Sequence, residues 1–256
     1  MTAGIRLGWA ALKTKELTIC GLAAVRARFQ SDPGSILRLF FDRPTGKKIG
    51  LLCKALAATR KVYRCVEPEE LAKISGSIHH GGIVAVVVAP PLRSPGPAEI
   101  KLWAARRQPL LILDRVGNAH NLGALVRTAA YLGVNQIVLA DAPESARPND
   151  AAYRVAEGGM EQVTVWVARD LPVLIRDLRS AGYAVLAAAT RGGIPRGAED
   201  AKSAIALVLG NEEHGIAPKV AAACTRQVTI PGTGAVESLN VSVAGAILMW
   251  ELFGRK

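Results

Sequence analysis

The second half of the chain alternates between short apolar runs and longer segments with a helical spacing of apolar residues. The apolar runs have the length of strands and span residues 110–113, 136–140, 163–167, 183–189, 204–209 and 227–230. Helices are predicted over residues 122–132 and 148–157, from Asp170 to Gly182, and over residues 241–253. Because strands and helices alternate, the pattern predicts an α/β domain whose parallel sheet is covered by helices on both faces.

The first part of the chain has shorter elements in a different arrangement. A strand, a glycine turn and a helix are predicted over residues 16–29, with further strands over 36–41, 61–65 and 82–88 and helices over 50–59 and 67–74. This mixture predicts a small α/β domain over residues 16–89, preceded by a flexible basic segment, residues 1–15. Four prolines among residues 89–97 interrupt helices and central strands, so we expect a linker over residues 90–104 and a second domain over residues 105–256.

Polar loops that contain glycine follow three of the predicted strands. These loops are residues 114–121, 210–215 and 230–240. In an open α/β sheet, the carboxyl ends of the strands form the edge where ligands bind. The polar residues also have ordinary structural interpretations, as helix caps (Asn121, Ser238, Asn240) or as solvated charges (Arg127, Glu212).

Taken together, the three loops resemble the SpoU/TrmH family of RNA ribose 2′-O-methyltransferases, part of the SPOUT class. The family motif N-x-G-x-x-x-R-T-A is matched by residues 121–129, G-x-E-x-x-G by residues 210–215, and I-P-x-x-G with S-L-N-V-S by residues 230–242. The motifs keep the family's order, and the resemblance covers residues 105–256. Nearer the N-terminus, residues 80–85 resemble the H-Q-G-x-V-A element that closes the RNA-binding domain in front of many such enzymes.

The resemblance implies a SPOUT fold with a C-terminal trefoil knot, a homodimer, and S-adenosyl-L-methionine as the methyl donor. It implies that backbone groups of Gly210, Ile230 and Leu239 bind this cofactor, with Thr190 nearby. For Ile230 and Leu239, side-chain packing in the core is the alternative interpretation, and both roles are compatible.

For the chemistry, the resemblance implies that Arg127 is catalytic, either as the base that removes the 2′-hydroxyl proton or as the group that stabilises the developing alkoxide. A guanidinium keeps its proton in proteins, which favours the second role. Asn121, at the expected N-cap of its helix, is implied to lie near the ribose, and Glu212 to orient Arg127 or Asn240. Ser238 and Asn240 are implied to position the cofactor, the ribose or the arginine.

The charge of the chain indicates a polyanionic partner. The formal net charge is +11, and residues 1–100 hold 15 Lys and Arg against 7 Asp and Glu. A basic first domain favours RNA, and the presence of this accessory domain favours ribosomal RNA. A transfer-RNA methyltransferase and a catalytically silent RNA-binding or ribosome-assembly protein are the alternatives. A nucleotide-dependent oxidoreductase is disfavoured, because no G-x-G-x-x-G follows a predicted strand.

Cysteine usage and hydropathy limit the function further. The four cysteines have no C-x-x-C spacing, and His79-His80 alone does not make a zinc site, so no metal is expected. No secretory signal is evident, and no apolar run approaches the length of about 18 residues that a membrane span needs. We therefore expect a cytoplasmic protein with reduced thiols and no membrane segment.

Overall fold

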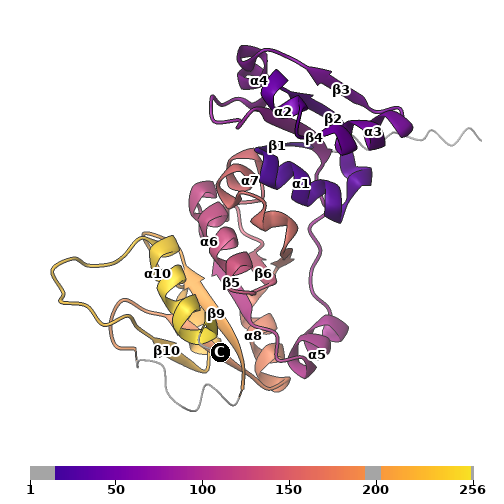
Figure 1. Ribbon diagram of the computed structural model, residues 1–256. Helices are drawn as coiled ribbons and strands as arrows, with labels where there is room; N and C mark the ends of the chain where they lie inside the picture. Colours follow the sequence, from indigo (N-terminus) through magenta and orange to yellow (C-terminus); the bar gives the residue numbers. More distant parts are fainter. Residues whose placement is uncertain (1–14, 194–202, 255–256) are drawn as a thin grey trace, which may run out of the picture.

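The structure is a computed structural model that describes residues 15–193 and 203–254. Its strands form two separate sheets, one of four strands and one of six. Figure 1 shows the four-stranded sheet and its helices at the top and the six-stranded sheet below them. The expected flexible segment 1–15 lies outside the described residues except for Lys15.

The N-terminal sheet has the strand order β1-β4-β2-β3. β4 pairs antiparallel with β1 and β2, whereas β2 and β3 are parallel. Its elements are β1 (Glu16–Cys20), α1 (Leu22–Ser31), the 3-10 helix η1 (Pro33–Ser35), β2 (Ile36–Phe41), α2 (Arg43–Gly46), α3 (Gly50–Ala58), β3 (Val62–Cys65), α4 (Pro68–Ser75) and β4 (Ile83–Val88). The strands and helices predicted for this part of the chain are confirmed.

The second sheet has the order β10-β8-β9-β5-β6-β7, and neighbouring strands are parallel throughout. Its strands are β5 (Leu110–Asp114), β6 (Gln136–Ala140), β7 (Thr164–Ala168), β8 (Tyr183–Ala188), β9 (Ala204–Gly210) and β10 (Arg226–Val228). Its helices are α5 (Pro97–Ala105), α6 (Ala119–Tyr131), α7 (Asp150–Ala156), the 3-10 helix η2 (Gly159–Glu161), α8 (Leu171–Ser180), α9 (Pro218–Ala223) and α10 (Val241–Met249). Among the described residues, no helix has the length and apolarity to span a membrane.

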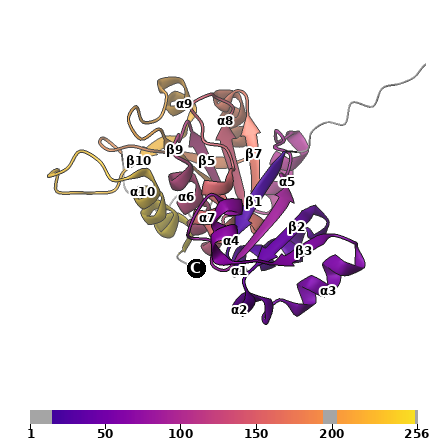
Figure 2. The ribbon, with the colours of Figure 1, turned by 90° about the horizontal axis from the view of Figure 1, so that it is seen from above.

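Alternate side chains of the central strands face two layers of helices. In β5, Leu111 and Leu113 belong to a buried cluster with side chains of α6, α7 and α10, whereas Leu110 and Ile112 belong to one with side chains of α5, α8 and α9. Figure 2 shows these two groups of helices on opposite sides of the sheet. A strand buried on both faces must be apolar throughout, which explains its continuous apolar run in the sequence. The predicted parallel sheet with helices on both faces is confirmed.

The proline-rich linker is shorter than expected. Residues 97–104, which the sequence assigns to the linker, belong to helix α5. Pro97 stands in the first turn, where the missing N–H group costs no helical hydrogen bond. Ile100 and Trp103 are buried against the second sheet, and the ring of Trp103 meets that of Trp166 edge-on, with centroids 5.4 Å apart. Proline therefore starts a helix here, and the linker ends before it.

The last helix is regular only over α10 and then widens into a π-helical turn, η4 (Trp250–Gly254). One side of it is buried and holds Val241, Gly245, Leu248, Met249 and Leu252. The opposite side carries an exposed apolar stripe of Val243, Ile247 and Trp250, which are 48%, 40% and 53% exposed. The helix is thus apolar on both sides, but the described residues bury only one of them.

The two sheets share one apolar core. A single cluster of buried side chains extends from Leu17 and Val25 of the N-terminal domain to Tyr153 and Met160, which follow β6 in the second domain. The backbone N–H of Thr18 also donates to the Asp150 carboxylate at 3.0 Å. The N-terminal domain is therefore packed against α7 and η2, in addition to its covalent link (Figure 1).

Candidate active site

The loops that carry the three sequence motifs meet at one edge of the second sheet. β5, β9, β8 and β10 are neighbouring parallel strands, so their carboxyl ends lie at the same edge. The loop after β5 leads into α6, the loop after β9 spans residues 211–217, and the loop after β10 leads into α10. Figure 1 shows the last of these, in yellow, extending from the body of the domain before it enters α10.

One amide side chain connects all three loops. Nδ2 of Asn121 donates to Oε1 of Glu212 at 2.8 Å, and its Oδ1 accepts a hydrogen bond from Nδ2 of Asn240 at 3.2 Å. The second carboxylate oxygen of Glu212 accepts from the backbone N–H of Gly117 at 3.2 Å. A continuous network, which we call the Asn121 network, thus links the start of α6, the loop after β9 and the start of α10.

Asn121 can make these contacts because it does not cap its helix. α6 begins at Ala119, earlier than expected, and Asn118 is its N-cap. Oδ1 of Asn118 accepts hydrogen bonds from the backbone N–H groups of His120 and Asn121 at 2.8 and 3.4 Å. The expectation that Asn121 is the N-cap is therefore wrong, because Asn118 satisfies the free N–H groups and leaves the Asn121 amide for the neighbouring loops.

Asn240 caps its helix, which is one of the alternatives that the sequence left open, and it also contacts Asn121. Its Oδ1 accepts from the backbone N–H and the hydroxyl of Ser242, at 2.9 and 2.6 Å, and so caps α10. At the same time its Nδ2 donates to Asn121. Both polar atoms of the Asn240 side chain are therefore hydrogen-bonded. Ser238, the other candidate cap, lies exposed in the preceding loop.

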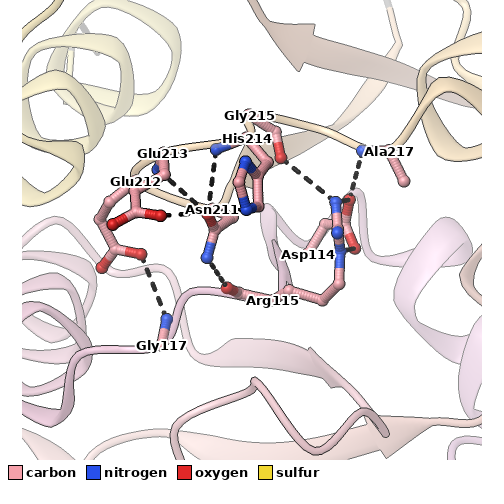
Figure 3. A network of polar contacts seen from close by, with 9 residues as sticks. All are labelled: Asp114, Arg115, Gly117, Asn211, Glu212, Glu213, His214, Gly215 and Ala217. Carbon is pink, nitrogen blue, oxygen red and sulfur yellow. Dashed lines mark hydrogen bonds and ion pairs between the residues drawn. The ribbon is translucent and has the colours of Figure 1, made fainter.

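A second polar network, which the sequence analysis missed, holds the loop after β9 (Figure 3). Asp114, at the end of β5, is 3% exposed and accepts a hydrogen bond from the backbone N–H of Ala217 at 2.7 Å. Its carboxylate also accepts a hydrogen bond from Nε of Arg115 at 3.1 Å, which raises the pKa of Arg115. Arg115 in turn donates to the carbonyl of Gly215 at 3.4 Å, and its own carbonyl accepts from Nδ2 of Asn211 at 2.9 Å. The sequence feature that could have indicated this network is Asp114, an acidic residue directly after the apolar run of residues 110–113.

The loop after β9 folds back tightly against Gly210, the last residue of that strand. Asn211 and Gly215 exchange two backbone hydrogen bonds of 3.1 and 3.0 Å. A Cβ atom built on Gly210 would lie 2.3 Å from the carbonyl carbon of Gly215. Only glycine fits at position 210, so the first glycine of G-x-E-x-x-G has a steric reason in this fold.

Arg127 does not contact the Asn121 network. It lies on the exposed side of α6, where its NH1 pairs with Oε1 of Glu157 at 3.0 Å, and the two side chains are 56% and 61% exposed. Glu212, which was expected to orient Arg127 or Asn240, binds Asn121 instead and reaches Asn240 only through it. Sequence reasoning missed Glu157 as the partner of Arg127. The two residues are separated in the chain by β6 and α7, and no local sequence pattern connects positions so far apart.

The remaining predicted site residues lie after β8 and β10. Thr190 is exposed, and its carbonyl accepts a hydrogen bond from the Thr229 hydroxyl at 3.4 Å. Ile230 is partly buried against the core, whereas Leu239 is 44% exposed and Val236 is 72% exposed. The loop before α10 therefore presents uncovered apolar surface close to polar backbone. Within residues 15–193 and 203–254, no three His, Cys, Asp or Glu side chains gather as a metal site would require.

The fold is shared with a solved RNA-modifying enzyme. The AdoMet-bound rRNA methyltransferase of Sinorhizobium meliloti aligns with a TM-score of 0.76 at 23% sequence identity, over 93% of this chain and 87% of that chain. At this level of identity, the similarity shows a common fold and no more.

Sequence comparisons identify the family. Residues 108–250 match the profile of the SpoU rRNA Methylase family, and residues 18–92 match that of RNA 2′-O ribose methyltransferase substrate binding. YfiF of Escherichia coli O157:H7, an uncharacterized tRNA/rRNA methyltransferase, is 32% identical over 93% of this chain and 68% of its own length. RlmB of Nitrosomonas europaea, a 23S rRNA (guanosine-2′-O-)-methyltransferase, is 30% identical over 92% of this chain and 90% of its own. The chain belongs to the SpoU rRNA methylase family.

Proposed function

We propose that this protein transfers the methyl group of S-adenosyl-L-methionine to the 2′-hydroxyl of a guanosine in 23S ribosomal RNA. The observation that carries the proposal is the Asn121 network, which joins all three family motifs at the ligand-binding edge of the sheet. The RlmB relative, which acts on guanosine in 23S rRNA, supports the choice of substrate. We expect the protein in the cytoplasm, where ribosomes work.

The residues at the sheet edge fit this methyl donor. Gly210, Ile230 and Thr190 offer backbone donors and acceptors at the ends of neighbouring strands, as an adenine edge requires. The uncovered side chain of Leu239 offers an apolar surface for the adenine ring, and the exposed Ser238 hydroxyl a polar contact for the donor's amino-acid end. When bound, the donor supplies an electrophilic methyl carbon attached to a sulfonium.

The protein's own side chains position the acceptor. Arg127 carries a permanent positive charge on the exposed side of α6, and we assign it to the phosphate beside the target ribose and to the negative charge that develops on the 2′-oxygen. Asn121 and Glu212 hold the motif loops at a fixed separation, and Asn240 holds the loop before α10. Positioning of two reactants can supply much of the rate enhancement of such a displacement.

We also propose that the C-terminal path forms the trefoil knot of the SPOUT fold. Two close approaches support this. A Cβ atom on Gly193 would lie 2.6 Å from the carbonyl carbon of Val228, so the loop after β8 touches the segment after β10. A Cβ atom on Gly245 would lie 2.4 Å from a methyl of Leu125, so α10 then packs tightly against α6. Knots are rare in proteins, and an experimental trace of residues 189–203 around the C-terminal segment is the direct test.

A map of 2′-O-methylation in total RNA, from cells with and without the gene, tests the function. We expect one 2′-O-methylated guanosine of 23S rRNA to disappear without the gene and to return with the wild-type copy. Loss of a methyl group from tRNA instead would favour a tRNA substrate, which the description of YfiF includes. An unchanged map, together with no binding of S-adenosyl-L-methionine in calorimetry, would indicate a catalytically silent RNA-binding protein.

The exposed stripe of α10 supports a homodimer. Its three residues follow one another at helical spacing and are each at least 40% exposed. In a C2 dimer the same patch of both copies is covered at once. We therefore expect two copies of the chain to bury this stripe against each other.

Sedimentation is expected to give a dimer mass at micromolar concentration, and Ile247→Glu is expected to give monomers, because a charge would be buried in the interface. Val173→Glu, on the exposed side of α8, is the matched control and should leave the mass unchanged. A wild-type monomer with full activity would rule out the dimer.

Basic residues of the N-terminal domain are expected to supply RNA affinity. Arg43, Lys47 and Lys48 are exposed in and after α2. Their joint replacement by Gln should weaken RNA binding and flatten the slope of log affinity against log salt by roughly two, since each lost phosphate contact releases about 0.7 fewer counterions. Fluorescence anisotropy at several salt concentrations measures this slope. The same replacement of Lys101, Arg106 and Arg107, exposed in and after α5, should leave the slope unchanged; equal slopes for both triple variants would contradict the expectation.

A further inference from the structure

The catalytic arginine is held by a residue outside the three motifs. On the exposed side of α6, NH1 of Arg127 pairs with Oε1 of Glu157 at 3.0 Å. A surface ion pair between two mobile side chains contributes little by itself. It has more effect when one partner is fixed, because the fixed charge then selects one orientation of the other.

The backbone of Glu157 is fixed in this way. It ends α7 in the left-handed conformation, with φ 44° and ψ 45°, which residues with side chains rarely adopt. The next two residues are glycines in close backbone contacts. A Cβ on Gly158 would lie 3.4 Å from Cα of Ala24 in α1, and a Cβ on Gly159 would lie 3.1 Å from Cα of Arg127 itself. The surrounding structure therefore maintains a conformation that the chain would not adopt alone.

The same segment is the point where the N-terminal domain docks. Glu161, at the end of η2, pairs with Arg28 of α1 at 2.8 Å, and the side chains are 0% and 7% exposed. Arg28 also donates to the hydroxyl of Tyr153 at 3.1 Å. Residues 157–161 thus contact the catalytic helix through Glu157 and Gly159, and the RNA-binding domain through Gly158 and Glu161.

We propose that Glu157 is a positioning residue for Arg127, and that docking of the N-terminal domain through Arg28 and Glu161 holds Glu157 in place. The proposal rests on the proposed function of Arg127 as the phosphate-binding and charge-stabilising group. A guanidinium has five N–H donors, and the ion pair with Glu157 is made through NH1, so other donors stay available for a phosphate. The N-terminal domain then has two roles: it binds RNA, and it orients the arginine of the other domain.

Steady-state methylation by the full-length protein tests the role of Glu157. We expect Glu157→Ala to lower kcat about tenfold, with KM for S-adenosyl-L-methionine unchanged, because misplacement of a catalytic group reduces turnover more than cofactor binding. Glu157→Gln should restore only part of kcat, because its amide keeps the size of the side chain but carries no charge to attract the guanidinium. Glu69→Ala, at an exposed glutamate of α4, is the matched control and should behave as wild type. Wild-type kcat in Glu157→Ala would overturn the proposal.

A second variant tests the link to the N-terminal domain. The double variant Arg28→Met with Glu161→Met removes both buried charges and leaves neither unpaired. It should lower kcat like Glu157→Ala, and combining it with Glu157→Ala should add little, since both changes release the same arginine. If the triple variant lowered kcat by the product of the two separate reductions, the coupling between Glu157 and the Arg28–Glu161 pair would be overturned.

Nuclear magnetic resonance of the Arg127 Nε–H group gives a readout without turnover. The order parameter of this N–H bond should fall in Glu157→Ala and in the double variant. An unchanged order parameter in both variants would overturn the proposal. If these signals change as expected but the wild-type protein methylates no RNA, the proposed function fails and the positioning of Arg127 by Glu157 stands.

Discussion

Arg127→Ala is expected to lower the rate of RNA methylation by roughly 10² to 10³, the range seen when one positioned charge-stabilising donor is removed. The side chain is on the exposed side of α6 and belongs to neither the Asn121 network nor the buried core, so its removal should leave the fold intact. Binding of S-adenosyl-L-methionine should change less than twofold, because the residues assigned to the cofactor lie after β8, β9 and β10.

Turnover with saturating cofactor, combined with calorimetry of cofactor binding, measures both effects. Arg127→Lys is expected to recover only part of the rate, since an ammonium lacks the planar, two-pronged contact with a phosphate. Arg176→Ala, at an exposed arginine of α8, is the matched control and should retain full turnover. If Arg127→Ala turned over like this control, Arg127 would have no catalytic role.

Arg28→Met is expected to destabilise the protein by about 3–5 kcal/mol, the usual range when a buried ion pair loses one partner. The side chain of Glu161 is 0% exposed, and its Oε2 has no hydrogen-bond partner among the described residues. Burial raises the pKa of Glu161, while Arg28 opposes this rise. Without Arg28 the carboxylate would be charged, buried and uncompensated, so the melting temperature should fall by roughly 10 °C.

The sign of the pH dependence follows from the raised pKa of Glu161. A carboxyl whose pKa is higher in the folded than in the unfolded state favours folding as it takes up its proton. The loss of stability caused by Arg28→Met should therefore be largest at pH values above the folded-state pKa of Glu161. It should shrink as the solution is acidified toward the ordinary pKa range of a carboxyl group. Thermal unfolding at several pH values measures it. Arg26→Met, at an exposed arginine of the same helix, is the control, and a penalty that grows on acidification would refute the explanation.

Most strands and helices could be predicted because their signals are local. Strands of the second sheet are buried on both faces and appear as apolar runs, and Asp170 with Pro172 marks the start of α8 without ambiguity. At α6 the sequence predicts the N-cap at Asn121, whereas the structure has it at Asn118. The Asn121 amide binds Glu212 from another loop, a contact that local sequence does not reveal. The same limit applies to α5, where a proline is compatible with both a linker and a first helical turn.

The sequence motifs could identify residues of the candidate site but not the contacts between them. The motifs identify Asn121, Glu212 and Asn240, yet their pairing depends on strand order in the sheet, which no residue spacing encodes. Arg127 and Glu157 likewise meet only because the segment after α7 folds back onto α6.

The two bonds of Asn240 have a consequence for synthesis of the protein. Its amide begins α10 and also completes the Asn121 network, so formation of this helix and closure of the polar site favour each other. A nascent chain emerges N-terminus first, so α10 appears after the strands and helices that carry the rest of the network. While the ribosome is still extending the chain, the RNA-binding domain can already be folded, but the enzyme has no finished site. A chain released too early, without the final helix, would therefore compete for RNA without modifying it.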